Sequence, residues 1–248
     1  MTRKYLAITA LLLAPLAASA TTWSFNGTGT TVPSGIKSIQ AFSINSGNTT
    51  FSTATSWTAY SGGIGVKGFS SESTAEPQHA TDNNGNLEAI LFRFDESTIL
   101  DKLSIGWPST IAYDSDISVL RYIGTVDSTG ALPSTSNISG ESISQLLSRG
   151  WEFVGSYNTV KGTEEDINPD HLSSSYWLIS AYSSSWGSGK GETTQVDNGN
   201  DYFKLLSLTS GAPGTTPGTS VPEPTSLLLL AGGMLGWRLN RKNQALAA

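Results

Sequence analysis

The sequence of 248 residues contains no cysteine, and this absence excludes several kinds of chemistry. Disulfides, thiol nucleophiles, cysteine-ligated zinc sites and iron–sulfur clusters all require cysteine sulfur. Histidine is nearly as scarce, because only His79 and His171 are present, and the G-x-S-x-G motif of many serine hydrolases does not occur. The folded part of the chain must therefore be held together without disulfides, and the sequence does not predict a serine triad.

Positive charge is sparse in the central part of the chain. Residues 21–220 contain 9 Lys and Arg against 19 Asp and Glu, a net charge of −10, whereas the whole chain carries −6. Proteins that bind nucleic acid or anionic lipid need clustered Lys and Arg to neutralise phosphates. Nucleic acid is therefore not expected as a partner.

Long hydrophobic runs are also missing, but a short one lies at each end. The first, over residues 5–16 of MTRKYLAITALLLAPLAASA, follows two basic residues and precedes the small residues Ala18 and Ala20. This order is typical of a secretory signal peptide, with the small residues at the positions that signal peptidase reads. The sequence predicts a signal peptide over residues 1–20, cleaved after Ala20, and the alternative is a short N-terminal helix of the domain.

The second short run, Leu227–Trp237, lies near the C-terminus. Its eleven residues fall well below the ~20 that a helix needs to cross a bilayer. Polar signals flank this run on both sides, namely Val221, Pro222, Glu223 and Pro224 before it and Arg238, Arg241 and Lys242 after it. This three-part order resembles the PEP-CTERM sorting signal of exosortase substrates in Gram-negative bacteria.

The resemblance implies a route of export for the chain. The short helix within residues 221–248 would lie transiently in the inner membrane, with its basic end held in the cytoplasm by the positive-inside rule. The Pro-Glu-Pro segment would then lie at the outer face, where exosortase cleaves it and frees the protein to the cell surface or the extracellular space. A permanent single-span anchor is the alternative. Signal peptidase and exosortase are the expected transient partners.

Between the two ends, the chain divides into a body and a linker. Residues 209–220 (TSGAPGTTPGTS) have the composition of a flexible linker, which leaves residues 21–208 as one domain with room for a substantial core. Short segments with alternating apolar and polar residues predict half-buried β-strands. Eight of them lie at residues 36–44, 51–60, 87–94, 100–107, 117–123, 151–157, 176–182 and 202–208. We therefore expect an all-β domain, an antiparallel β-sandwich of jelly-roll-like type.

The sequence also predicts one short helix and one exposed aromatic side chain. In GESISQLLSRG (residues 140–150), Ile143, Leu146 and Leu147 fall on one helical stripe. Trp186 lies in SSSWGSG, where no alternating apolar neighbours accompany it, so we expect its ring to be exposed. An exposed aromatic ring of this kind could stack on the apolar face of a sugar.

Oxygen-rich loops suggest a hard cation. Asp114 and Asp116 stand at i and i+2, so their side chains face the same way on an extended segment. Asp82 in ATDNNGNLE and Asp201 in DNGND belong to two further loops of this kind. Calcium takes six to eight oxygen ligands from carboxylates, amides and carbonyls. These four aspartates are candidate calcium ligands, and the alternative is that they are ordinary turn residues.

The body itself resembles a family of exosortase-dependent surface proteins. The resemblance covers residues 60–208 and rests on EPQHATDNNGNLEAILFRF, LSIGW, DSDISVLRY, GWEFVGSY, SSYWLISAY and DYFKLLSL, in that order. It implies a secreted or surface protein of an exopolysaccharide-producing bacterium, and it provides no catalytic residues.

Three functions remain open from the sequence. The first is a non-enzymatic protein of the cell surface or extracellular matrix, processed by exosortase and associated with exopolysaccharide and biofilm. The second is a carbohydrate-binding module supported by calcium. The third is a glycoside hydrolase, which is supported only by carboxylates whose spacing the sequence does not show. In each case the chain is expected to be exported through an inner-membrane intermediate.

Overall fold

The computed structural model describes residues 19–73, 77, 79–107, 113–159, 161–192 and 194–211. Apart from Ser19, all of these belong to one compact unit. Most of the predicted processing residues lie outside the described part of the chain, namely Ala18, Val221, Pro222, Glu223, Pro224, Arg238, Arg241 and Lys242. Within the described ranges, no helix has the length and apolar character needed to cross a membrane.

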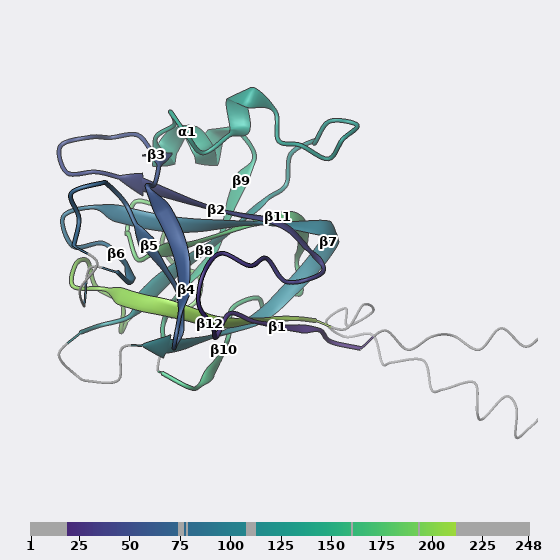
Figure 1. Ribbon diagram of the computed structural model, residues 1–248. Helices are drawn as coiled ribbons and strands as arrows, with labels where there is room; N and C mark the ends of the chain where they lie inside the picture. The colour runs from purple at the N-terminus through teal and green to yellow at the C-terminus, as the bar shows by residue number, and fades with distance from the viewer. Residues whose placement is uncertain are drawn as a thin grey trace, which may run out of the picture. The chain divides into compact units, whose positions relative to one another are not determined.

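The described residues form twelve β-strands and one short α-helix (Figure 1). The strands are β1 (Thr22–Ser24), β2 (Ile36–Ile44), β3 (Ser52–Thr53), β4 (Ser56–Tyr60), β5 (Gly63–Lys67), β6 (Thr81–Asp82), β7 (Leu87–Trp107), β8 (Asp116–Tyr122), β9 (Trp151–Asn158), β10 (Glu164–Asp166), β11 (Ser173–Ala181) and β12 (Tyr202–Ser210). A 3₁₀ turn spans Ser134–Ser136, and α1 spans Ile143–Ser148. All pairings between these strands are antiparallel, so the prediction of an antiparallel all-β domain with one short helix is confirmed.

The long strand β7 connects two groups of strands. Its first half pairs with β2 and β11, and β8 and β9 continue this group beyond β11. Its second half pairs with β12 and β10, and β12 also pairs with β1, β5 and β6. The sequence predicted two separate strands here, but the hydrogen-bonded strand continues through the polar residues 95–98 between them. One strand therefore serves both groups.

The main hydrophobic cluster contains side chains from both groups of strands. Phe92 and Trp177 come from the first group, and Leu103 and Leu205 come from the second. All four side chains are buried. The packing of the two groups against each other is therefore the main source of hydrophobic stabilisation in the domain.

A second hydrophobic cluster covers the other face of the first group. In β7, Leu91 belongs to this second cluster, whereas its neighbours Ile90 and Phe92 belong to the main one. Successive side chains of a strand point to opposite faces, which explains this division. Leu146 of α1 completes the second cluster, and Figure 1 shows α1 on this side, near β9 and β2.

The helix α1 forms where the sequence predicted it. Its N-terminus has a capping box, in which the Gln145 N–H donates to Ser142 Oγ at 3.3 Å. In return, the Ser142 N–H donates to Gln145 Oε1 at 2.8 Å. These two bonds satisfy two of the backbone donors that a helix N-terminus leaves unpaired.

The prediction that Trp186 is exposed is wrong. Its side chain is buried and stacks on Phe51 with 5.7 Å between the ring centroids. Its indole N–H donates to Ser180 Oγ at 3.3 Å. The loop after β11 folds back over the second hydrophobic cluster, so Trp186 is a packing residue and cannot stack on a sugar.

The start of the body is attached to the end of β12. The Thr21 N–H donates to Ser210 Oγ, and the Ser210 N–H donates to the Thr21 carbonyl, both at 2.8 Å. β1 then pairs with β12 from Thr22 onwards. Cleavage after Ala20 remains a prediction, and it would leave all of this pairing in the mature chain.

Candidate functional site

Three of the four predicted calcium ligands meet in one place. One carboxylate oxygen from each of Asp114, Asp116 and Asp201 lies within 4.8 Å of the other two. We call these three residues the Asp201 cluster. Asp116 and Asp201 are completely buried, whereas Asp114 is partly exposed. The cluster therefore has one side that ions can reach from solvent.

The starts of β8 and β12 bring these aspartates together. Asp116 is the first residue of β8, and Asp114 forms an isolated parallel bridge with Asp201, which directly precedes β12. The Tyr202 N–H donates to the Asp114 carbonyl at 2.8 Å, and the Asp114 N–H donates to the Asn200 carbonyl at 3.2 Å. Asn200 has a φ of 67°, a left-handed conformation that asparagine adopts more readily than most residues. This turn directs Asp201 towards the other two carboxylates.

Most oxygens of the buried pair accept hydrogen bonds from the protein. Asp201 Oδ1 accepts from the Asp116 N–H at 3.1 Å, and Asp201 Oδ2 accepts from the side-chain amide of Asn83. Asp116 Oδ2 accepts from the Asp197 N–H at 2.7 Å. Asp116 Oδ1 has no hydrogen-bond partner although it is buried. A buried polar atom without a partner is unfavourable, and a bound cation at this position would remove that penalty.

Burial and mutual repulsion disfavour the charged forms of this pair. Burial raises the pKa of Asp116 to about 7, and the nearby charge of Asp114 adds to the rise. Burial, followed by repulsion from Asp116, raises the pKa of Asp201 to about 8. Without a cation, the cluster therefore tends to hold protons near neutral pH. A divalent cation would stabilise the ionised forms and release those protons on binding.

Asp82 does not belong to the Asp201 cluster. It meets Glu72 and Glu88 in a second group, where one carboxylate oxygen of each residue lies within 4.8 Å of the others. We call these three residues the Glu88 cluster. Their exposed fractions are 8% for Glu72, 2% for Asp82 and 0% for Glu88. This cluster is thus more completely enclosed than the first.

Three different elements supply the Glu88 cluster. Glu88 is the second residue of β7, on the same face as Ile90 and Phe92 of the main hydrophobic cluster. Asp82 ends the short strand β6, and Glu72 lies in the loop after β5. Burial raises the pKa of each carboxyl, to about 7 for Asp82 and well above the usual range for Glu88, where the charges of Asp82 and Glu72 add to it.

Asn83 links the two clusters. It directly follows Asp82, its side-chain amide donates to Asp201 Oδ2, and its side-chain oxygen accepts from the Asp201 N–H at 3.0 Å. The same two backbone segments also pair with each other, with Asp82 opposite Tyr202. Asn83 therefore contacts the Asp201 cluster directly and adjoins the Glu88 cluster in the chain.

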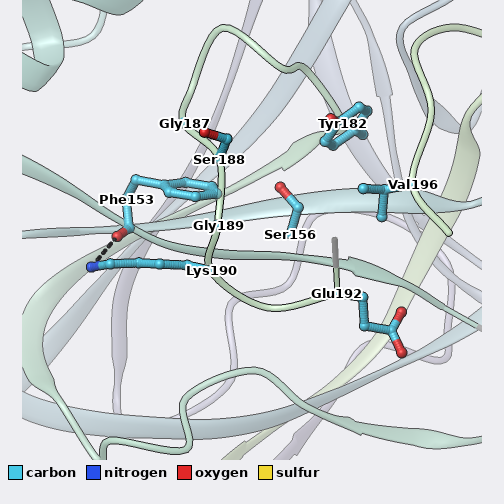
Figure 2. Close-up of a pocket in the computed structure, with 9 residues that line it drawn as sticks. All are labelled: Phe153, Ser156, Tyr182, Gly187, Ser188, Gly189, Lys190, Glu192 and Val196. Carbon is cyan, nitrogen blue, oxygen red and sulfur yellow. Dashed lines mark hydrogen bonds between the residues drawn. The ribbon is translucent and has the colours of Figure 1, made fainter. Parts of the chain in front are cut away.

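A small pocket lies beside the Asp201 cluster. Figure 2 shows its lining, which consists of Phe153, Ser156, Tyr182, Gly187, Ser188, Gly189, Lys190, Glu192 and Val196. The Lys190 ammonium donates to the Phe153 carbonyl at 3.1 Å, and the Tyr182 N–H donates to the Asp116 carbonyl at 3.0 Å. The pocket volume is about 90 Å³, well below the ~300–1,000 Å³ of typical small-molecule pockets. It can receive one edge of a sugar ring but cannot enclose the ring.

Glu72 and Glu88 were not among the site residues predicted from the sequence. For Glu88 a signal exists, because in LEAILFRF it alternates in step with Ile90, Phe92 and Phe94, all of which are buried. A carboxylate on the apolar face of a strand must find a partner, and this rule alone identifies Glu88 as unusual. Glu72 lies in a polar loop, and nothing in its neighbourhood distinguishes it.

Comparison with known proteins identifies the C-terminal segment. No curated protein and no solved structure is significantly similar to the chain. Residues 220–242 match the family model of the PEP-CTERM protein-sorting motif, which includes every sorting residue predicted from the sequence. This motif implies an exported protein that exosortase processes and that reaches the cell surface through a membrane intermediate. The chain therefore carries a PEP-CTERM protein-sorting motif at residues 220–242.

Proposed function

We propose that the chain is a non-enzymatic protein of the cell surface or extracellular matrix, associated with exopolysaccharide. The sorting motif at residues 220–242 carries this proposal, because a protein delivered to the outside of the cell by exosortase acts there. The two connected strand groups support the interpretation of the body as a sandwich, an architecture common in exported binding proteins. The acidic, disulfide-free body also fits an extracellular role in which divalent cations are available.

Mass spectrometry of the mature protein from its own cells tests the processing. We expect a chain that begins at Thr21 and lacks everything after the Val221–Pro224 region. Glu223→Ala should leave an uncleaved precursor in the inner-membrane fraction, whereas the linker variant Thr216→Ala should be processed normally. Recovery of an intact Trp237 from the surface fraction of the wild type would overturn the proposed processing.

Calcium binding at the Asp201 cluster is part of the proposed function. Opposite ligands of one calcium ion lie about 4.6–5.2 Å apart, because each Ca–O distance is about 2.3–2.6 Å. The three carboxylate oxygens of this cluster lie within 4.8 Å of one another, so one ion can contact all three. The ion would hold the loop before β12 against the start of β8. Asp197 belongs to this loop, and its N–H already donates to Asp116.

The pocket in Figure 2 favours a second candidate, a calcium-supported carbohydrate-binding module. Its Tyr182 and Val196 belong to the segments that the Asp201 cluster holds in place. If sugar binds here, Tyr182→Ala should weaken binding to the cell's own exopolysaccharide, and chelator should weaken it equally in the wild type. The matched control is Ile123→Ala, which removes an apolar side chain that is 57% exposed outside this pocket. Equal retention of wild type and Tyr182→Ala on immobilised polysaccharide would reject this candidate.

A glycoside hydrolase is the least supported of the three functions. The catalytic carboxylates of glycosidases flank the bound sugar and must touch it. Asp116 and Asp201 have no exposed surface, and both are bound to backbone N–H groups of neighbouring segments. Their geometry suits a structural ion better than a substrate.

A further inference from the structure

The Glu88 cluster contains buried carboxylate oxygens for which the surrounding protein provides no hydrogen bond. Of its carboxylate oxygens, Asp82 Oδ2 and Glu88 Oε1 are buried and have no hydrogen-bond partner. Both belong to residues that are at least 98% buried. Among the residues that the structure describes, no Lys, Arg or His forms an ion pair with any of the three carboxylates. Buried carboxylates usually have a paired charge or coordinate a metal.

The backbone around the cluster holds the carboxylates in fixed positions. The Gly68 N–H donates to Glu72 Oε2 at 2.6 Å, and the Asp82 N–H donates to Glu88 Oε2 at 3.1 Å. The Asn84 N–H donates to Asp82 Oδ1 at 3.0 Å. Each carboxylate thus has one oxygen bound to the backbone, and on Asp82 and Glu88 the second oxygen is left for another ligand.

Gly68 shows how closely the chain approaches this site. A Cβ atom at Gly68 would lie 2.7 Å from Glu88 Oε1 and 3.1 Å from the Cβ of Ser43. The absence of a side chain at this position therefore lets the Gly68 backbone reach Glu72 while Glu88 Oε1 lies directly beside it. The unpartnered oxygen of Glu88 thus faces the segment to which Glu72 is bound.

We propose that Glu72, Asp82 and Glu88 form a second divalent-cation site, which binds calcium inside the domain. One oxygen from each residue lies within 4.8 Å of the others, a spacing that a single calcium ion can bridge. Calcium fits better than magnesium, because magnesium keeps several of its waters and this cluster is almost closed to solvent.

The proposed ion joins three segments that are distant in the sequence. It ties the loop after β5 to β6 and to the start of β7, the strand shared by both groups. This site is separate from the Asp201 cluster and does not depend on it, because the two sets share no carboxylate. If both sites bind, the domain holds two ions, one on each side of the connection made by Asn83.

Counting bound calcium by elemental analysis, after dialysis of the purified chain against micromolar free calcium, tests the proposal. We expect two equivalents in the wild type, one in Glu88→Gln and one in Asp116→Asn. Glu88→Gln keeps the oxygen that accepts from the Asp82 N–H and places an NH₂ group where Oε1 has no partner. The control Asp127→Asn alters an exposed carboxylate outside both clusters and should retain two equivalents.

A thermal measurement on the same variant separates ion binding from a merely structural role. In chelator, Glu88→Gln should melt at the same temperature as the wild type or higher, because it removes a buried carboxylate that Asp82 and Glu72 repel. In millimolar calcium it should melt lower than the wild type. A variant that melts equally far below the wild type in both conditions would assign Glu88 a packing role and overturn the second site.

The calcium counts of the two variants distinguish a failure of the Glu88 site from a failure of the Asp201 site. If Glu88→Gln loses one equivalent of calcium and Asp116→Asn loses none, the Glu88 site is supported. The same result would show that the Asp201 cluster does not bind calcium, contrary to the proposed function. Loss in Asp116→Asn alone overturns the second site and leaves the first. A wild type that holds no calcium after this dialysis overturns both.

Discussion

Replacing Asp116 by asparagine should stabilise the calcium-free protein at pH 8 and change it little at pH 4. Asp116 is completely buried, and its pKa in the folded protein is about 7, whereas that of aspartate in an unfolded chain is about 3.9. Between these values the folded state binds a proton that the unfolded state has lost, so stability falls as pH rises. The stability that comes from proton binding by folded Asp116 is fully present below about pH 4, and it is lost as the pH rises through about 7.

The expected gain in stability of Asp116→Asn follows from the same shift in the pKa of Asp116. One pKa unit corresponds to ~1.4 kcal/mol, so ionising Asp116 in the folded protein lowers its stability by up to ~4 kcal/mol at pH 8. Asp201 repels Asp116 and has a pKa of about 8, so the two carboxyls share protons and one substitution recovers only part of this amount. We expect a gain of ~2–3 kcal/mol, or roughly 5–10 °C in Tm for a domain of this size. The asparagine oxygen can still accept from the Asp197 N–H.

Thermal unfolding followed by circular dichroism is the assay. It compares wild type, Asp116→Asn and the exposed control Asp127→Asn in chelator at pH 4 and pH 8, then in millimolar calcium at pH 8. The order of wild type and Asp116→Asn should reverse in calcium, because the variant lacks one charged ligand. A lower Tm for Asp116→Asn than for wild type in chelator at pH 8 would refute the reasoning that the buried charge is a net penalty.

Two further predictions concern packing. Trp186→Ala should lower stability by ~3–5 kcal/mol because it empties a buried site against Phe51, whereas the exposed control Ile123→Ala should change it by less than ~0.5 kcal/mol in urea unfolding. Gly63→Ala should prevent stable folding, because its Cβ would lie within van der Waals overlap of the Leu205 backbone; Gly47→Ala has a similar positive φ but open space around it, and should lose only ~1 kcal/mol. Equal unfolding midpoints for the two glycine variants would contradict the close approach of β5 to β12.

Local patterns predicted the strands well where each strand buries a continuous face. The bounds predicted for residues 36–44 agree with β2, and the predicted helix contains α1 with its capping box. The division of β7 into two strands was wrong because residues 95–98 are polar and interrupt the alternation. The strand nevertheless continues past an irregularity in its pairing, because β11 pairs on both sides of it, with Thr98 opposite Ser174 and Arg93 opposite Tyr176. The continuity of β7 depends on hydrogen bonds to strands that are distant in the sequence. The local pattern of residues does not encode these bonds.

For the same reason, the sequence predicted only some of the residues in the two carboxylate clusters. Asp114 and Asp116 are close in the chain, so their i, i+2 spacing suggested a shared face. Asp201 joins them only because β12 returns beside β6 and the turn at Asn200 bends towards Asp114. Asp82 looked equivalent to Asp201 as an oxygen-rich turn residue, yet its side chain meets Glu72 and Glu88. The type of residue indicated the chemistry, and only the pairing of strands indicated which residues share a site.

The absence of cysteine and the presence of two carboxylate clusters can be understood together. A disulfide typically stabilises an exported domain by ~2–4 kcal/mol, and this chain has none. An ion that binds only the folded state stabilises it by about 2.7 kcal/mol when calcium is a hundredfold above Kd. Two such sites would contribute ~5 kcal/mol, comparable with the whole stability of many domains. Because this stabilisation depends on the free calcium concentration, the domain would become fully stable only after export to a calcium-rich exterior. The chain would thereby remain easier to unfold on the cytoplasmic side, before it crosses the inner membrane.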